Sequence, residues 1–444
     1  MRFLGVGDAC DLGALYLQLK NQGHEVKVFT GIPACQDVLD GLLDKIPDWK
    51  QELDWIRAAG DDGIIIFENV GRGLGATQDE LRRQGFNVVG GSAYGDRLEN
   101  DRAYGQSVLS EVGLATAPHW NFKSRADAVQ FIRERPARYV LKFNESECSQ
   151  DNFIGRLHNG ADVLAALGRT DETAEKKGFI LSEFIPGIEM GVGAYFDGKE
   201  FLLPACLDWE HKRFFPGDLG ELTGEMGTVV TYDRTHTFFE STLGRLQPRL
   251  REHGHCGYVN LNTIVNENGI WPLEFTSRFG YPGYAILSAL QLSGWDELFR
   301  MMTRRDIGRF ETRPGFAVGL LISTPPFPLV RPELRAAKGL PVFFDPELTA
   351  EDERNIHLGE VSWQNEYLVT SGSFGWTLVV TGTGDDVREA QEAANRLAGL
   401  IHVPDGRYRR DIGDKLIKGE FAQLEQWGLL DPVLRVPKFG SARR

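Results

Sequence analysis

The stretch Leu-Glu-Phe-Thr-Ser-Arg-Phe-Gly at residues 273–280 is the most informative part of the sequence. In a β-strand, Glu274, Thr276 and Arg278 would point to the same face, because successive side chains alternate. A carboxylate, a hydroxyl and a guanidinium on one face suit a site for Mg²⁺ and a transferring phosphoryl group. The alternative is an exposed face with a Glu–Arg pair, which contributes less than about 1 kcal/mol.

The neighbouring segments favour a site over an exposed strand face. Residues 258–261 and 270–273 are mostly apolar, which disfavours full exposure of this part of the chain. Asn262 follows the first apolar run and offers a further oxygen ligand. We therefore expect Glu274 and Thr276 to bind the metal with Asn262 beside them, and the following arginine to neutralise phosphate charge.

Length and composition limit the class of protein. With 444 residues the chain predicts about two to four domains, and a hydrophobic fraction of 42% is ordinary for a globular protein. The net charge of −14 argues against nucleic-acid and anionic-membrane partners, which need a basic surface. No apolar run is long enough to cross a bilayer, and no signal peptide is evident. Five scattered cysteines without a C-x-x-C pair fit a reducing cytoplasm.

The first part of the chain alternates between strand and helix patterns, which predicts a parallel sheet. Strands are expected at residues 2–6, 25–29, 63–67 and 87–89, and helices at residues 12–19 and 74–84.

The middle of the chain begins with a helix that Asn100 or Asp101 can cap. Short strand patterns are frequent from about residue 179 to residue 279. Near the end, a strand at residues 376–380 precedes a helix with apolar residues on one side. The tail after Gly419 has no firm pattern.

The turn Gly-Val-Gly-Asp at residues 5–8 has more than one explanation. A dinucleotide fingerprint needs a third glycine, but Cys10 stands in that place, and no acidic residue ends the second strand. A glycine turn that leads into a helix can still bind an anion through free amides and the helix dipole. An ordinary strand-to-helix turn explains the pattern equally well, so Gly7 and Asp8 are substrate contacts only on the anion-binding alternative.

Lys142 lies near the end of the apolar strand expected at residues 139–143. A lysine in such a strand is costly unless its ammonium finds an anion, either an ATP phosphate or a nearby carboxylate. Farther on, the strand pattern at residues 180–185 leads through a Pro-Gly turn to Glu189. This arrangement suits an adenine hinge with Glu189 on the ribose hydroxyls, although a surface glutamate beyond a turn is the simpler alternative.

A charged segment at residues 208–213, Asp-Trp-Glu-His-Lys-Arg, is followed by a glycine-rich one at residues 220–227, Gly-Glu-Leu-Thr-Gly-Glu-Met-Gly. A run of charges is usually a solvated face. The flanking segments here are apolar and rich in glycine, and a flexible loop of this kind can hold an anion through its backbone amides. A substrate loop is therefore at least as good an interpretation.

In combination, these segments resemble phosphoribosylamine–glycine ligase, also called glycinamide ribonucleotide synthetase, an ATP-grasp enzyme of purine synthesis. The similarity runs from Met1 to about Lys415, and the matching segments fall in the family's order. They are residues 98–104 (entry to the ATP-grasp lobe), 182–189 (hinge), 210–213 with 223–227 (the Asp-His-Lys-Arg and Thr-Gly-Gly-Met-Gly signature), 274–280 (metal and phosphate strand), and 368–372 with 408–413 (C-terminal domain).

The resemblance implies a multidomain α/β and α+β protein. It predicts an N-terminal parallel-sheet (pre-ATP-grasp) domain at residues 1–97, a two-lobed ATP-grasp core at 98–312 with its small lobe at about 115–185, a small C-terminal α/β domain at 313–418, and a tail at 419–444. The implied activity is ATP-dependent ligation of a small carboxylate to a small amine through an acyl phosphate, by a cytoplasmic monomer or homodimer.

The resemblance also assigns roles to single residues, with ATP and Mg²⁺ (or Mn²⁺) as cofactors. Catalysis is expected from Arg278, Lys142 and Lys212. The expected contacts are Arg102, Lys142, Glu183, Phe184, Ile185 and Glu189 for ATP, Glu274, Thr276 and Asn262 for the metal, and Gly7, Asp8, Glu210, Arg213, Thr223, Glu225, Gly280 and Tyr281 for substrates.

The chain also departs from the family pattern. Thr276 stands where the family has a metal-binding asparagine, and Arg102 stands where it has a lysine. Tyr-Pro-Gly at residues 281–283 replaces Asp-Pro-Glu, and residues 144–150 lack the family's glycine-rich phosphate lid. We therefore expect a ligase with altered substrates. The alternatives are a genuine phosphoribosylamine–glycine ligase and a catalytically degenerate nucleotide-binding relative.

Overall fold

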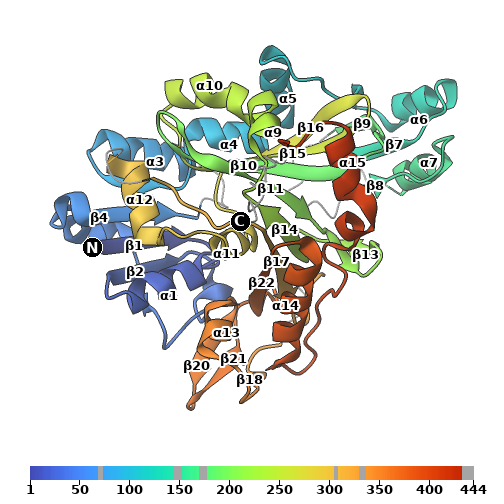
Figure 1. The fold of residues 1–444 in the computed structure, drawn as a ribbon. Helices are drawn as coiled ribbons and strands as arrows, with labels where there is room; N and C mark the ends of the chain where they lie inside the picture. Colours follow the sequence, from blue (N-terminus) through green and yellow to red (C-terminus); the bar gives the residue numbers. More distant parts are fainter. Residues whose placement is uncertain (69–73, 144–152, 170–177, 305–308, 330–336, 433–444) are drawn as a thin grey trace, which may run out of the picture.

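The structure is a computed structural model that describes residues 1–68, 74–143, 153–169, 178–304, 309–329 and 337–432 (Figure 1). The segment 144–150, where the sequence lacks a glycine-rich lid, lies outside these residues.

The N-terminal part comprises β1 (Arg2–Gly7), α1 (Gly13–Asn21), β2 (Glu25–Thr30), β3 (Asp44–Lys45), α2 (Leu53–Arg57), β4 (Gly63–Phe67), α3 (Leu74–Arg83) and β5 (Asn87–Val89). Its strands form a parallel sheet in the order β3-β2-β1-β4-β5, which confirms the prediction. Ile64 and Ile66 join one hydrophobic cluster, whereas Ile65 and Phe67 join another. Both faces of the sheet are therefore packed, which explains the unbroken apolar run of β4.

Two helices, α4 (Ala93–Asn100) and α5 (Arg102–Glu111), lead from this sheet to the rest of the molecule. Asp101 caps α5 by accepting a hydrogen bond from the amide of Tyr104 at 3.0 Å. This confirms the cap expected from the sequence and places Arg102 at the first position of the helix.

A small lobe follows, labelled at the upper right of Figure 1, and consists of β6 (His119–Phe122), α6 (Arg125–Glu134), β7 (Tyr139–Phe143), β8 (Phe153–Ile154), α7 (Ala161–Gly168) and β9 (Phe179–Glu183). The strands are antiparallel in the order β6-β9-β7-β8. The lobe has a hydrophobic core of its own, in which Ile132, Tyr139 and Leu181 are buried. Lys142 pairs with Ile180 across β7 and β9, so it is held on the sheet of this lobe.

The centre of the molecule is an eight-stranded antiparallel sheet made of β16 (Gly269–Thr276), β15 (Cys256–Asn266), β10 (Ile188–Asp197), β11 (Phe201–Glu210), β14 (Gly227–Thr231), β17 (Phe316–Ile322), β22 (Leu378–Gly384) and β19 (Ile356–Leu358), in this order. Because β14 pairs with β17, the sheet runs on across the predicted boundary near residue 312. The division into domains stays a prediction.

Further helices lie around this sheet: α9 (His236–Ser241), α10 (Gln247–Glu252), α11 (Gly283–Ser288), α12 (Trp295–Arg304) and α14 (Val387–Gly399). The apolar side of α14 is buried, as its spacing predicts. A Cβ at Gly382 of β22 would lie on the backbone of Ala394, so the glycine lets this helix approach the sheet closely.

The C-terminal part adds the strands β18 (Pro341–Phe344), β20 (Val361–Gln364), β21 (Tyr367–Thr370) and β23 (Ile401–His402), with α13 (Ala350–Arg354) beside them. The buried carboxylate of Glu360 accepts hydrogen bonds from the amides of Ser373, Phe374, Gly375 and Trp376. The strand expected at 376–380 therefore begins two residues later, because the amide of Trp376 is committed to Glu360.

The segment after Gly419 forms a short helix, α15 (Phe421–Gln426), which the sequence did not predict. Phe421 packs its ring against those of Trp209 and Phe316, on the central sheet. A helix this short carries too little periodicity to be recognised from sequence. No helix in the described part of the chain is long and apolar enough to span a bilayer.

Candidate functional site

The main cavity, about 500 Å³, lies between the small lobe and the central sheet. Strands β7 and β9 line it on one side and β10, β11 and β16 on the other, with a hairpin of β12 (Arg213–Phe215) and β13 (Leu219–Leu222) at its edge. The residues predicted from the sequence that line this cavity are Arg102, Lys142, Glu183, Phe184, Ile185, Glu189, Glu210, Lys212, Arg213 and Glu274.

Lys212 is the centre of a charge network in this cavity. Its Nζ lies 2.9 Å from Oε1 of Glu189, 3.1 Å from Oε2 of Glu210 and 3.6 Å from Oε1 of Glu274. Arg102 approaches the other oxygen of Glu274 at 3.6 Å. Burial alone would lower the pKa of Lys212, but the three carboxylates outweigh burial and raise it well above its usual range. Lys212 is therefore a permanent cation beside the cavity.

Lys142 is a second cation in the cavity, and it is differently placed. Burial lowers the pKa of Lys142, and the positive charge of Arg102 lowers it further. Within the described residues no carboxylate comes within ion-pair distance of its ammonium group, so the nearby-carboxylate alternative has no support there. A buried lysine beside another cation favours the entry of an anion.

The wall expected to hold adenine is formed by β9 and the turn after it. The amide of Glu183 donates to the carbonyl of Pro118 and that of Phe184 to the carbonyl of Arg138, both at 2.9 Å. Both amides therefore donate hydrogen bonds within the protein. Glu183 and Phe184 can contact a ligand in the cavity only through their other atoms. The guanidinium carbon of Arg138 lies 3.3 Å from the centre of the Phe184 ring, which fixes that side chain.

The residues expected to hold a metal have different surroundings, although Asn262 is the cross-strand partner of Glu274. Glu274 lines the main cavity, whereas Thr276 lines a second, smaller one. Asn262 lines neither; its amide nitrogen donates to Glu189 at 3.2 Å and to Glu210 at 3.3 Å. No cluster of three or more His, Cys, Asp or Glu side chains among the described residues is arranged to hold a metal ion.

Arg278 does not continue the face of Glu274, and this expectation is wrong. Strand β16 ends at Thr276, so the alternation of side chains stops before Arg278 is reached. Its Nε lies 3.2 Å from Oε1 of Glu99, whose other oxygen accepts the amide of Ser277 at 2.9 Å. Arg278 lines neither cavity and instead ties the end of β16 to α4.

The smaller cavity, about 50 Å³, adjoins the main one, because Glu210 lines both. Asp208 and Glu225 also line it, together with Thr228 and Gly280. Burial, followed by the charge of Glu210, raises the pKa of Asp208 to about 8. Burial also raises the pKa of Glu225 well above its usual range.

Asp208 is not among the site residues predicted from the sequence. The spacing of Asp208 and Glu210 places both on one face of β11, and this spacing was the feature that could have identified the pair. The contact with Asn260, whose Nδ2 lies 2.5 Å from Oδ2 of Asp208, depends on strand pairing that a sequence does not reveal.

The turn at Gly7 and Asp8 does not reach either cavity. Instead, Glu68 at the end of β4 accepts the amides of Asp11 at 3.0 Å and Leu12 at 3.3 Å. A Cβ at Gly7 would overlap the Glu68 carboxylate, so the glycine makes room for it. Two amides ahead of α1 are therefore occupied by the chain's own carboxylate, which favours the ordinary-turn alternative.

Two more predicted substrate residues, Thr223 and Tyr281, also have structural contacts. Thr223 is fully buried and donates from both its amide (2.7 Å) and its hydroxyl (2.8 Å) to the carbonyl of Lys212. Tyr281 stacks on Trp376 with ring centres 5.3 Å apart and lines neither cavity. Thr223 thus orients Lys212, and Tyr281 joins α11 to the C-terminal part.

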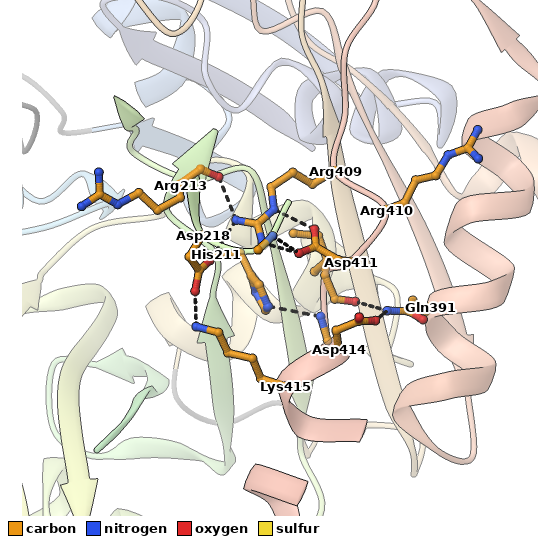
Figure 2. Close-up of polar contacts among 12 residues, drawn as sticks. His211, Arg213, Asp218, Gln391, Arg409, Arg410, Asp411, Asp414 and Lys415 are labelled. Atoms are coloured by element: carbon orange, nitrogen blue, oxygen red, sulfur yellow. Dashed lines mark hydrogen bonds and ion pairs between the residues drawn. The ribbon is translucent and has the colours of Figure 1, made fainter. Parts of the chain in front are cut away.

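A buried arginine ties the C-terminal part to the hairpin at the edge of the main cavity (Figure 2). Arg409 is 1% exposed, and its Nε and Nη2 donate to the carboxylate of Asp411 at 2.9 Å and 2.8 Å. Its Nη1 donates to the carbonyl of Arg213 at 2.8 Å and to Asp218 at 3.1 Å. Arg213 and Asp218 both line the main cavity, so Arg409 holds one edge of the site in place.

His211 adds a second link between the same segments (Figure 2). The amide of Gly413 donates to its Nε2 at 3.2 Å, so its Nδ1 carries the proton and donates to the carbonyl of Trp209 at 3.1 Å. Burial, followed by the charge of Arg409, lowers the pKa of His211 to about 4. His211 is therefore a neutral structural residue at pH 7, next to Lys212 in sequence.

Relatives of known identity match both the sequence and the fold. The family described as "Phosphoribosylglycinamide synthetase, ATP-grasp (A) domain" matches residues 100–284. The phosphoribosylamine–glycine ligase of Escherichia coli O157:H7 is 26% identical over 406 residues, which cover 87% of this chain and 90% of that protein. The corresponding protein of Leptospira interrogans is 25% identical over 447 residues, covering 92% and 97%.

A crystal structure of phosphoribosylamine–glycine ligase from Thermotoga maritima has the same fold. Its TM-score is 0.70 at 22% identity, covering 93% of this chain and 100% of that one. The predicted fold class, the resemblance and the class of enzyme are thus confirmed. The chain contains an ATP-grasp domain of the phosphoribosylglycinamide synthetase type at residues 100–284, and it is similar to phosphoribosylamine–glycine ligases along most of its length.

Proposed function

We propose that this ligase binds ATP in the main cavity and joins a small carboxylate to a small amine through an acyl phosphate, with substrates that differ from those of its named relatives. The observation that carries the proposal is the convergence of Arg102, Lys142 and Lys212 on one cavity. Lys142 has no carboxylate partner in the described part of the chain. A triphosphate supplies the anion that Lys142 lacks.

The residues of the cavity divide the work of binding. Apolar side chains of the small lobe, such as Val140 and Ile180, would enclose the base, and Lys142 would contact the phosphates. A divalent cation, Mg²⁺ or Mn²⁺, would be held by Glu274 together with phosphate oxygens, because Mg²⁺ commonly takes one or two carboxylates and completes its shell with phosphate and water. When bound, it neutralises phosphate charge. Positioning by these side chains supplies much of the rate acceleration in such reactions.

The setting of the enzyme is part of the same proposal. Cys10, Cys35 and Cys206 are free and buried, which fits a reducing cytoplasm. The acidic chain fits small-molecule substrates rather than nucleic acid. A monomer or homodimer, with the domains divided near residues 97, 312 and 418, remains our proposal.

The names of the relatives favour a second candidate, a genuine phosphoribosylamine–glycine ligase. Two observations weigh against it. Glu68 occupies amides ahead of α1 that a phosphate would otherwise use, and Tyr281 with Gly283 replaces the acidic Asp-Pro-Glu segment. Expression in a purine auxotroph lacking phosphoribosylamine–glycine ligase separates the candidates, and growth without purine would refute our choice.

The test of catalysis is ADP release. Purified protein is incubated with ATP, Mg²⁺ and a panel of small carboxylates and amines, and ADP is measured together with mass-spectrometric detection of the amide product. Activity that is lost in Glu274→Gln and retained in Glu347→Gln, an exposed carboxylate remote in sequence, supports the proposal. ATP binding without turnover on the whole panel would favour the catalytically degenerate alternative.

A further inference from the structure

The smaller cavity differs from the main one in its charge. Asp208, Glu210 and Glu225 line it, and no lysine, arginine or histidine is among the residues that do. Its other polar lining groups are neutral, such as Thr228 and Asn260. The cations of the site contact the opposite side of Glu210, where Lys212 lies 3.1 Å away. Three carboxyl groups therefore line this cavity without a cationic side chain lining it beside them.

One oxygen atom of Asp208 shows the same lack of a partner. The residue is 5% exposed, and its Oδ2 accepts a hydrogen bond from Asn260. Its Oδ1 is buried and has no hydrogen-bond partner within the described residues. A buried carboxylate oxygen without a hydrogen bond destabilises the folded chain. A ligand that donates to it would remove this cost.

The N-terminal part of the chain offers no complementary site for a phosphate at the start of α1. The amides of Asp11 and Leu12 donate to Glu68, and that of Gly13 donates to the carbonyl of Cys10 at 3.0 Å. The side chain of Asp11 adds a carboxyl group there, whose pKa burial raises to about 6. The amides and positive field that normally hold a phosphate at a helix start are thus already used.

The size of the smaller cavity narrows the class of ligand further. A water molecule requires a cavity volume of roughly 10–15 Å³, and the volume of this cavity is about 50 Å³. A short alkylammonium group fits this volume, and a phosphorylated sugar does not.

We propose that the smaller cavity binds the primary ammonium group of a short, unphosphorylated amine substrate, and that Asp208 accepts a proton from it. The inference rests on the proposed ligase function, because it assigns the amine substrate of that same site. Asp208 would be a catalytic residue, whereas Asn260 would orient its carboxylate.

The step balances in protons and charge. An alkylammonium ion transfers one proton to the Asp208 carboxylate, which becomes a carboxylic acid and later returns the proton to solvent. The amine nitrogen attacks the carbonyl carbon of the acyl phosphate, the C–N bond forms, and the C–O bond to phosphate breaks. The second nitrogen proton leaves with the phosphate as hydrogen phosphate. The raised pKa of Asp208 lies closer to the pKa of an alkylammonium ion than the pKa of an ordinary carboxyl group does, which makes the proton transfer easier.

A divalent metal ion is the competing occupant of an acidic cavity. No group of three or more His, Cys, Asp or Glu side chains in the described ranges is arranged to hold one. The neutral donors and acceptors Thr228, Asn260 and Tyr258 are instead suited to hydrogen bonds around a small organic ion. The geometry therefore favours an ammonium group.

The test measures binding of ethylammonium chloride to the full chain saturated with a non-hydrolysable ATP analogue, by saturation-transfer NMR titration. The variants are Asp208→Asn and, to narrow the cavity, Gly280→Ala. A Cβ at Gly280 would meet no atom within 4 Å, so the alanine enters open space without a clash. Glu347→Gln serves as the matched control. Melting temperatures verify that each variant is folded.

We expect binding at least tenfold weaker in Asp208→Asn, weaker in Gly280→Ala, and unchanged in Glu347→Gln. Tetramethylammonium, which has no N–H donor, should not compete, and Mg²⁺ should not displace ethylammonium. Binding of ethylammonium with wild-type affinity by both Gly280→Ala and Asp208→Asn would overturn the inference. Displacement of ethylammonium by Mg²⁺ would overturn it as well. Failure of the wild-type chain to bind the ATP analogue would instead count against the proposed function, since Asp208 does not line the main cavity.

Discussion

The contact of Arg409 with the hairpin at the main cavity leads to a prediction of both stability and binding. In Arg409→Met the side-chain volume is nearly kept, but four hydrogen bonds to Asp411, Arg213 and Asp218 are lost. Arg409 is 1% exposed, so the loss leaves Asp411 as a charge without its partner. Breaking a buried ion pair by removing one member costs about 3–5 kcal/mol, and we expect a loss of this size.

The measurement is a double-mutant cycle with Asp411→Asn, by urea unfolding followed with two probes to verify a single transition. If the pair accounts for the loss, Arg409→Met combined with Asp411→Asn should be less destabilised than the sum of the single variants, by about 1–3 kcal/mol. The hydrogen bonds of Arg409 outweigh burial and lower the pKa of Asp411. Its contribution is therefore present above the unfolded pKa of about 3.9 and lost as the pH falls through the lower folded value.

Hydrogen exchange tests the structural part of the same prediction. The amide of Gly217, in the hairpin, donates to Oδ2 of Asp411 at 2.8 Å. Arg409→Met should speed its exchange and weaken binding of an ATP analogue, because Arg213 and Asp218 line the main cavity. Strict additivity of the two substitutions, with unchanged exchange at Gly217, would show that Arg409 does not hold this edge of the site.

Three further predictions are simpler. Lys142→Met should weaken ATP-analogue binding more than tenfold by calorimetry without lowering the melting temperature, because within the described residues Lys142 has no carboxylate partner to lose. Glu360→Gln should cost about 2–4 kcal/mol in urea unfolding, since it replaces charged hydrogen bonds to backbone amides; an unchanged midpoint would contradict it. His211, His255 and His357 have folded pKa values lowered by burial to about 4, 3 and 4. Each unfolded imidazole binds a proton below about pH 6.5, so each should cost about 2 kcal/mol by pH 5, and a flat melting temperature from pH 7 to 5 would refute this.

The sequence predicted local structure well where a segment is regular and buried. The run at β4 and the face of α14 are examples, because periodicity reports burial directly. Prediction from the sequence failed at the ends of strands, where contacts with residues distant in the sequence decide the conformation. The late start of β22 depends on Glu360, and the end of β16 at Thr276 turns Arg278 toward Glu99.

The same limit applies to the site. Lys142 and Glu274, which both line the main cavity, stood out in the sequence because a charged residue in an apolar strand is informative by itself. Glu68 was missed, since its amide partners ahead of α1 lie 56 and 57 positions away in sequence. Asp208 was not singled out for a comparable reason, because its neighbour Asn260 is on a strand that pairing alone brings close.

Glu210 is the residue at which the two halves of the proposed reaction meet. It lines both cavities, with Lys212 on one side and Asp208 on the other. Its charge contributes to the raised pKa of Asp208 and, after burial, to that of Glu225, and it also supports the cationic state of Lys212. A phosphate would therefore be attracted to one side of Glu210 and repelled from the other, while an ammonium group would experience the reverse. This division of charge would keep ATP and the amine in separate cavities, so that they meet only at the carboxylate substrate between them.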